Sequence, residues 1–150
     1  MQTAFLLIAH GSRDPAWAEP FTRLAHGAGA RLAFVEMGSP TVDEAVTRAI
    51  AEGARTVRLL PLFMAVGRHV RQDIPASVET LRAAHPDCTI EILPCLGENE
   101  HFWAALAEIV RAHMAETPPK TTTDTTTDTT IDAIAGATAQ DSDVGSTRSR

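Results

Sequence analysis

Residues 4–15 read AFLLIAHGSRDP, an almost wholly apolar run that ends in a histidine and a turn. Apolar residues without alternation are typical of a strand that is covered on both faces, as the strands of a parallel sheet are. Asp14 and Pro15 then supply the capping residue and the first-turn proline with which helices often begin. The stretch therefore predicts a buried strand over 4–9, followed by a turn and a capped helix.

The same alternation of short apolar runs and amphipathic stretches continues from Met1 to about Glu116. Strand-like runs occupy residues 4–9, 31–36, 56–60 and 89–93. Apolar residues at helical spacing occupy 17–28, 42–50, 70–81 and 102–110. Thr41 with Glu44 matches a capping box at the start of the second helix. The order βαβαβαβα predicts an α/β fold with a parallel sheet, in one domain over 1–116.

A different composition begins at Thr117, where Pro118 and Pro119 lead into a repeat of threonine and aspartate that runs to Thr130. Polar repetition with few large apolar residues cannot offset the entropy cost of ordering the chain. We therefore expect 117–150 to be a disordered, Thr/Asp-rich tail.

Composition and missing motifs exclude several classes of function. The net charge of -6 argues against a nucleic-acid binder, which would need a basic face. No apolar run approaches the roughly 18–20 residues of a membrane span, and no basic residue precedes the first apolar run as in a signal peptide. We therefore expect a cytoplasmic protein without membrane contact. The usual sequence motifs of nucleotide-binding proteins, zinc proteases and hydrolases are missing. Cys88 and Cys95 do not have the spacing of a metal or redox motif, so we expect both to be buried and reduced.

Three side chains of metal-binding type follow the ends of predicted strands. His10 closes the first strand, Glu36 ends the second, and His69 follows the third, at the start of a helix or in the loop before it. Because the carboxyl ends of parallel strands meet at one edge of a sheet, we expect the three to lie close together. Imidazole suits Co²⁺, Fe²⁺, Ni²⁺ and Zn²⁺, and a carboxylate can be a further ligand or a proton acceptor. The sequence therefore predicts a metal site at this edge.

Arginines and other histidines of the sequence lie near the predicted strand ends and helices. Arg13, Arg68 and Arg71 flank the two histidines, so an acidic protein acquires a local basic rim that suits carboxylates. His101 follows the fourth strand, and whether it joins the site stays open. The remaining histidines, which we interpret as structural, are His26, His85 and His113.

The sequence resembles the small, single-domain sirohydrochlorin chelatases of the CbiX type, in the class II chelatase family. The resemblance is carried by 6–15, LLIAHGSRDP, by 60–75, LPLFMAVGRHVRQDIP, and by the acid-ending run 33–36, AFVE. It implies a chelatase-like domain with a four-stranded parallel sheet and helices on both faces, comparable to half of a flavodoxin-like arrangement. It also implies a homodimer.

For the chemistry, the resemblance implies insertion of Co²⁺ or Fe²⁺ into sirohydrochlorin, in cobalamin or sirohaem biosynthesis, with no cofactor beyond the substrate metal. It implies that His10 and His69 take the metal and that Glu36 assists proton removal. Arg13, Arg68 and Arg71 then become candidates for binding the carboxylates of the tetrapyrrole.

Parts of this sequence also point to two other classes of function. Histidine phosphatases also place a His-Gly pair after a first strand, but they require an arginine before the histidine, where this chain has Ala9. A non-catalytic carrier that binds a divalent metal through His10 and His69 is the alternative that stays open.

Overall fold

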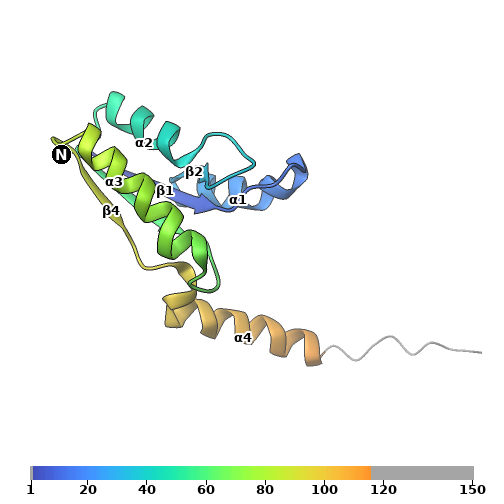
Figure 1. The fold of residues 1–150 in the computed structure, drawn as a ribbon. Coiled ribbons are helices and arrows are strands. Elements are labelled where there is room, and N and C mark those ends of the chain that lie inside the picture. The colour runs from blue at the N-terminus through green and yellow to red at the C-terminus, as the bar shows by residue number, and fades with distance from the viewer. Residues whose placement is uncertain (1, 116–150) are drawn as a thin grey trace, which may run out of the picture. The chain divides into compact units, whose positions relative to one another are not determined.

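The computed structural model describes residues 2–115, and the predicted tail at 117–150 lies outside the described residues. The element order agrees with the predicted alternation of strands and helices, with two short additional helical turns, η1 and η2 (Figure 1). The strands are β1 (Thr3–Ala9), β2 (Arg31–Phe34), β3 (Thr56–Pro61) and β4 (Thr89–Ile92). The helical elements are α1 (Pro15–Ala28), α2 (Val42–Ala51), η1 (His69–Asp73), α3 (Ile74–Ala84), η2 (Leu96–Glu98) and α4 (Glu100–Ala115).

The four strands form one parallel sheet in the order β2-β1-β3-β4, so the strand order reverses beside β1. Ala9 pairs with Phe34 on one side of β1, and Ile8 pairs with Pro61 on the other. The register therefore brings the ends of three strands to one edge of the sheet. In open α/β sheets, such an edge is where ligands bind.

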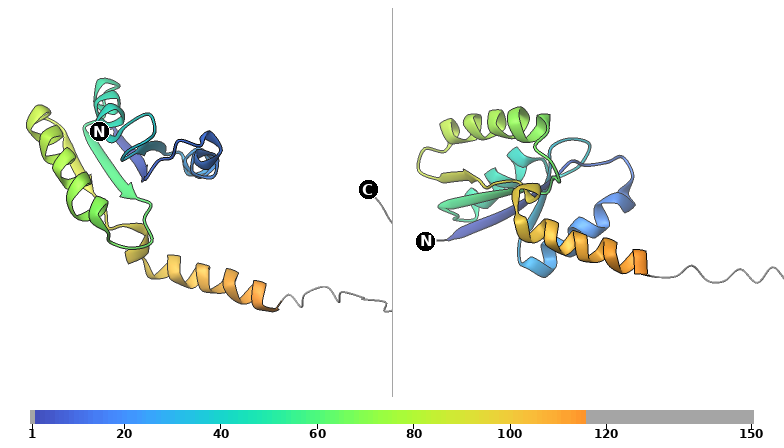
Figure 2. Two further views of the ribbon diagram at one scale, coloured as in Figure 1. Left: turned by 45° about the vertical axis from the view of Figure 1, so that its right-hand side comes forward. Right: turned by 90° about the horizontal axis from the view of Figure 1, so that it is seen from below.

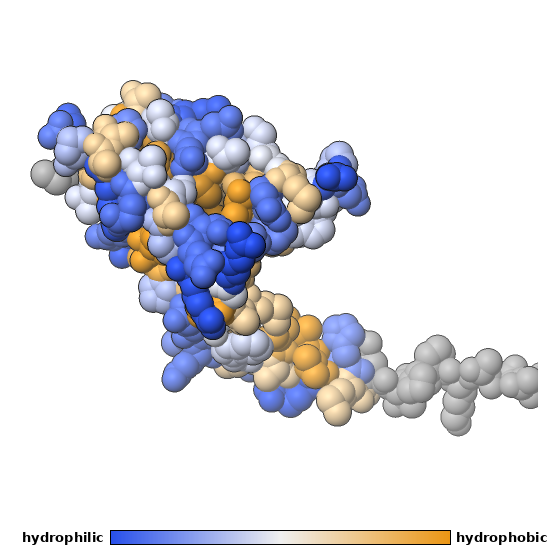
Figure 3. All heavy atoms as spheres, in the orientation of Figure 1, coloured by the Kyte–Doolittle hydropathy of each residue, from blue (hydrophilic) through white to orange (hydrophobic). Residues whose placement is uncertain are grey.

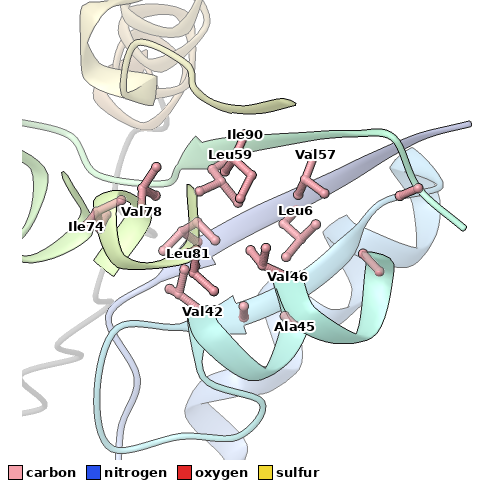
Figure 4. Close-up of a cluster of buried hydrophobic side chains, with 14 of the residues drawn as sticks. Leu6, Val42, Ala45, Val46, Val57, Leu59, Ile74, Val78, Leu81 and Ile90 are labelled. Atoms are coloured by element: carbon pink, nitrogen blue, oxygen red, sulfur yellow. The ribbon is translucent and has the colours of Figure 1, made fainter. Parts of the chain in front are cut away.

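The main hydrophobic core lies between the sheet and the helices α2 and α3 (Figure 4). Leu6, Leu59 and Ile90 from the strands meet Val46 and Val78 from the helices, and each of the five is at most 2% exposed. Helix α1 lies on the opposite face of the sheet (Figure 2, right). The sheet therefore carries helices on both faces, as the resemblance implied.

Local sequence explains where the first two helices begin. The Asp14 side chain accepts a hydrogen bond from the Ala16 amide, with Pro15 in the first turn of α1. Thr41 and Glu44 form the predicted capping box of α2, each side chain bonding the other's backbone amide. Both predicted helix starts are confirmed.

The second strand is shorter than predicted, because β2 ends at Phe34 and not at Glu36. The Phe34 amide donates to the carbonyl of Pro40, so the chain turns back on itself directly after the strand. The Glu36 amide instead donates to the His10 carbonyl at 3.0 Å. Glu36 thus lies beyond the strand but stays attached to the end of β1.

The third predicted helix begins as a single π-helical turn, η1, before it continues as α3. The Ile74 amide donates to the carbonyl of His69, five residues earlier. Pro75 follows and has no amide hydrogen to donate, so a regular α-helical bond is missing at this point. The wider turn places His69 and Asp73 at the two ends of η1.

Helix α4 differs from the other α-helices because none of its residues is buried. It projects away from the sheet in the ribbon views, and hydrophobic atoms are visible along its surface (Figures 1, 2 and 3). Its start is held by the Trp103 indole, which donates to the Gly97 carbonyl at 2.6 Å. Among the described residues, no helix is long and apolar enough to cross a membrane.

The two cysteines are buried and unpaired, as predicted. Burial raises the pKa of the Cys88 thiol. Burial also raises the pKa of the Cys95 thiol, with a further contribution from Glu98. A raised pKa leaves little thiolate at neutral pH, so neither cysteine is suited to nucleophilic or metal-ligating chemistry.

Candidate metal centre

Three side chains from separate parts of the sequence meet at the carboxyl edge of the sheet. His10 follows β1 directly, Glu36 lies two residues beyond β2, and His69 begins η1 after the loop that leaves β3. One potential ligand atom from each residue lies within 4.8 Å of the other two. The structure therefore brings together the three residues that the sequence singled out.

Gly11 makes this approach possible. Its backbone has φ of +104°, a conformation that side-chain-bearing residues rarely adopt. A Cβ atom at this position would lie only 1.7 Å from the carbonyl oxygen of Glu36. The glycine therefore lets the backbone of Glu36 come close to the chain at His10, and the Glu36 carboxylate lies beside the imidazole.

His10 contacts both other members of the cluster. Its Nε2 lies 3.2 Å from Oε1 of Glu36, and its ring meets that of His69 edge-on, with centroids 4.7 Å apart. Its Nδ1 lies 3.2 Å from the carbonyl oxygen of Gly11. The side chains of His10 and Glu36 are 38% and 49% exposed, so the centre is open to a ligand from solvent.

His69 is more enclosed, with 25% of its side chain exposed. Its Nδ1 lies 2.7 Å from Oδ2 of Asp73, and its ring stacks against Phe63 with centroids 6.1 Å apart. Sequence reasoning missed Asp73. The spacing of four residues between His69 and Asp73 was the available signal, because such residues are neighbours on one side of a helical segment.

The loop that carries Phe63 is held by the η2 turn. The Gly97 amide donates to the Phe63 carbonyl at 2.8 Å. A Cβ atom on Gly97 would lie 1.8 Å from the carbonyl oxygen of Met64, so the two backbones are in close contact. This contact fixes the loop from which His69 emerges.

The other candidate residues lie outside the cluster. Arg13, Arg68 and Arg71 are exposed on the loop after β1 and around η1, and Nε of Arg68 lies 3.7 Å from Oδ1 of Asp73. His101 is exposed in the first turn of α4 and is not a member of the three-residue cluster. The three histidines interpreted as structural, His26, His85 and His113, also lie outside it.

The donor set defines what this edge of the sheet can do. Two imidazoles and one carboxylate offer nitrogen and oxygen ligands that suit first-row divalent metals. Three partly exposed side chains would also leave coordination positions of a bound metal open to a second molecule. Such a site suits temporary binding and transfer of a metal better than a closed structural role.

Comparisons with known proteins identify the family to which the chain is similar. The model of the family described as CbiX matches residues 4–113. A protein named sirohydrochlorin cobaltochelatase from Methanocaldococcus jannaschii is 34% identical over 89 residues, covering 55% of this chain and 62% of the relative. One of the same name from Saccharolobus solfataricus is 36% identical over 75 residues, covering 47% of this chain and 59% of the relative. The chain thus spans about three fifths of the length of these curated relatives.

Solved structures share the fold. The structure described as a putative cobalamin biosynthesis CbiX protein from Marinobacter aquaeolei superposes with a TM-score of 0.69 at 34% identity, covering 76% of this chain and 96% of that one. The sirohydrochlorin chelatase SirB from Bacillus subtilis subspecies spizizenii superposes with a TM-score of 0.67 at 21% identity. That match covers 75% of this chain but only 51% of SirB.

Proposed function

The chain belongs to the CbiX family, and on that premise we propose that it inserts a divalent metal, Co²⁺ or Fe²⁺, into sirohydrochlorin. The observation that carries the proposal is the meeting of His10, Glu36 and His69 at an open edge of the sheet. The names of the curated relatives support sirohydrochlorin as substrate and cobalt as metal. In a second form of the proposal, the inserted ion is Fe²⁺ and the product serves sirohaem biosynthesis, because imidazole suits both Co²⁺ and Fe²⁺.

We assign different roles to the three residues. Insertion of a divalent ion requires two nitrogens of the macrocycle to lose their protons while the ion passes from the protein to the ring. His10 and His69 hold the ion as neutral imidazoles, and because these carry no negative charge they can release the ion to the ring. Glu36, beside His10 and 49% exposed, accepts a proton from the substrate and passes it to solvent, and the second proton leaves in the same way or directly to solvent.

The arginines near the centre are proposed to orient the substrate. Arg13, Arg68 and Arg71 are exposed around the site in a protein of net charge -6, so they form a local positive region. Sirohydrochlorin carries many carboxylates, and arginine binds a carboxylate through two parallel hydrogen bonds.

We also propose that the protein acts as a homodimer whose cleft lies between two subunits. The site residues are partly exposed, while a tetrapyrrole is a broad disc that a single copy would cover on one side only. Exposed apolar side chains support the idea that a second copy of the chain covers the other side of the tetrapyrrole. They are Met64 beside the site and Trp103, Ile109, Val110 and Met114 on α4. Light scattering should give twice the chain mass of 16.1 kDa, and a fully active monomer would contradict this assignment.

The test of the activity is direct. Purified protein is incubated with sirohydrochlorin and Co²⁺, and the absorbance change of the macrocycle is followed against the rate without protein. The same measurement with Fe²⁺ under anaerobic conditions ranks the two metals. Binding of Co²⁺ without any acceleration of insertion would overturn the proposal in favour of a metal carrier.

A further inference from the structure

The two imidazoles of the centre differ in the group that each Nδ1 meets. Nδ1 of His10 meets the backbone carbonyl of Gly11 at 3.2 Å. Nδ1 of His69 meets the carboxylate of Asp73 at 2.7 Å. A hydrogen bond to an ionised group is shorter and about twice as strong as one between neutral groups. At Nδ1, the ring of His69 is therefore held more firmly than that of His10.

The contact with Asp73 identifies where the proton of a neutral His69 ring resides. A carboxylate oxygen only accepts hydrogen bonds, so Nδ1 of His69 is the donor. A neutral imidazole that is protonated at Nδ1 presents a lone pair at Nε2. His10 is not fixed in this way, because its Nδ1 meets a carbonyl and its Nε2 lies 3.2 Å from the Glu36 carboxylate, and both of these groups only accept hydrogen bonds.

Asp73 is well placed to act on His69 without binding the metal itself. It ends the π-helical turn that His69 begins, and it is not a member of the three-residue cluster. Its side chain is only 32% exposed, and its second oxygen, Oδ1, lies 3.7 Å from Nε of Arg68. One carboxylate oxygen thus remains directed to the histidine while the other faces a cation.

We propose that Asp73 is a positioning residue for metal transfer, which holds His69 in the Nδ1-protonated form so that Nε2 binds the ion. A carboxylate in this position also makes the imidazole a better donor, and losing such a partner typically lowers metal affinity or activity about 10–100-fold. His69 is then the more firmly held ligand, and His10, whose Nδ1 meets a backbone carbonyl in place of a carboxylate, is the ligand that releases the ion first. This role in metal transfer rests on the proposed function, but the measurements that test it do not.

The first measurement needs no metal and no tetrapyrrole. Nitrogen-15 NMR of the imidazoles in the metal-free protein, in alkaline buffer, reports which ring nitrogen carries the proton. We expect the proton of His69 on Nδ1 in the parent protein. In Asp73→Asn, whose amide has lost the charge and can also donate, we expect a mixture or the Nε2-protonated form. A parent protein with the proton on Nε2 of His69 overturns the proposal without any variant.

The second measurement is the affinity for Co²⁺, by calorimetry and by the visible absorption of the bound ion. Asp73→Asn should weaken binding by about 10-fold or more, and Asp43→Asn is the matched control. Asp43 is an exposed aspartate that lines the same surface pocket as Asp73, where it accepts a hydrogen bond from Ser77. Its substitution should leave both the affinity and the proton position unchanged.

A double-mutant comparison separates positioning from a general effect on stability. Asp73→Asn should weaken Co²⁺ binding further in His10→Ala, where His69 is present, but not in His69→Ala, where its target is missing. An unchanged proton position, an unchanged affinity, or an equal loss in both backgrounds overturns the proposal. Failure of metal insertion by the parent protein, with these binding results intact, would instead overturn the proposed function.

Discussion

The carboxyl edge of the sheet and the face beneath α2 and α3 are built from the same strands, yet they differ in almost every physical property. Leu6 and Ile8 of β1 are fully buried on the covered face. His10, two residues further along the chain, keeps 38% of its side chain exposed at the edge. Burial of apolar area under the two helices supplies the main stabilisation, whereas the edge holds polar side chains in a few directed contacts. Stability and chemistry are therefore expected to respond to different substitutions.

The largest expected effect is on chemistry at the edge. His10→Ala and His69→Ala should each abolish metal insertion almost completely, because each removes a proposed metal ligand. Loss of a residue that only hydrogen-bonds to a ligand typically lowers metal affinity or activity about 10–100-fold, and loss of the ligand itself should cost more. Both side chains are partly exposed, so the melting temperature should fall by only a few degrees. Insertion assays and thermal unfolding of the same preparations test this. A collapse of the fold in either variant would contradict the separation of edge and core.

The opposite outcome is expected on the covered face. Leu59 is fully buried between the sheet and its helices, so Leu59→Ala should lower the free energy of unfolding by about 2–5 kcal/mol. Leu24, which is 49% exposed on α1, is the matched control and should change it by less than about 0.5 kcal/mol. Denaturant titration measures both. Insertion per folded molecule should be unchanged in Leu59→Ala, and a specific loss of turnover would show that core and site are coupled.

A smaller effect sharpens the comparison within the edge itself. Glu36→Gln keeps the size of the side chain but removes its capacity to accept a proton at neutral pH. We expect Co²⁺ affinity to stay close to that of the parent while insertion slows by about 100-fold, the lower end of the usual effect of a general base. Parent-like insertion at neutral pH would show that Glu36 is not the proton acceptor.

The smallest effect is expected from residues 117–150, which lie outside the described residues. Their Thr/Asp-rich composition offers little apolar area to bury, so we propose that they belong to neither region. A chain that ends at Glu116 should match the full chain in unfolding free energy and in insertion rate. A marked loss of either would assign the segment a role in the fold or at the site.

Much of the site was predictable because parallel strands share a direction. Once β1, β2 and β3 are identified, the residues just beyond their ends, His10, Glu36 and the segment leading to His69, are expected at one edge. Asp73 was missed for the opposite reason. It lies on a helical segment whose apolar pattern was used to identify the element, and such a pattern does not specify what a polar side chain contacts.

Four features could be derived from the amino-acid sequence: the α/β class, the order of the elements, the caps of α1 and α2, and the residue types that follow the strands. These features depend on local periodicity and on hydrogen bonds between near neighbours. Four others became visible in the folded chain: the strand order β2-β1-β3-β4, the contact of Gly11 with Glu36, the hydrogen bond of His69 to Asp73, and the absence of buried residues on α4. Those features depend on which distant surfaces pack together, and packing depends on shape and volume in three dimensions, which no local pattern encodes.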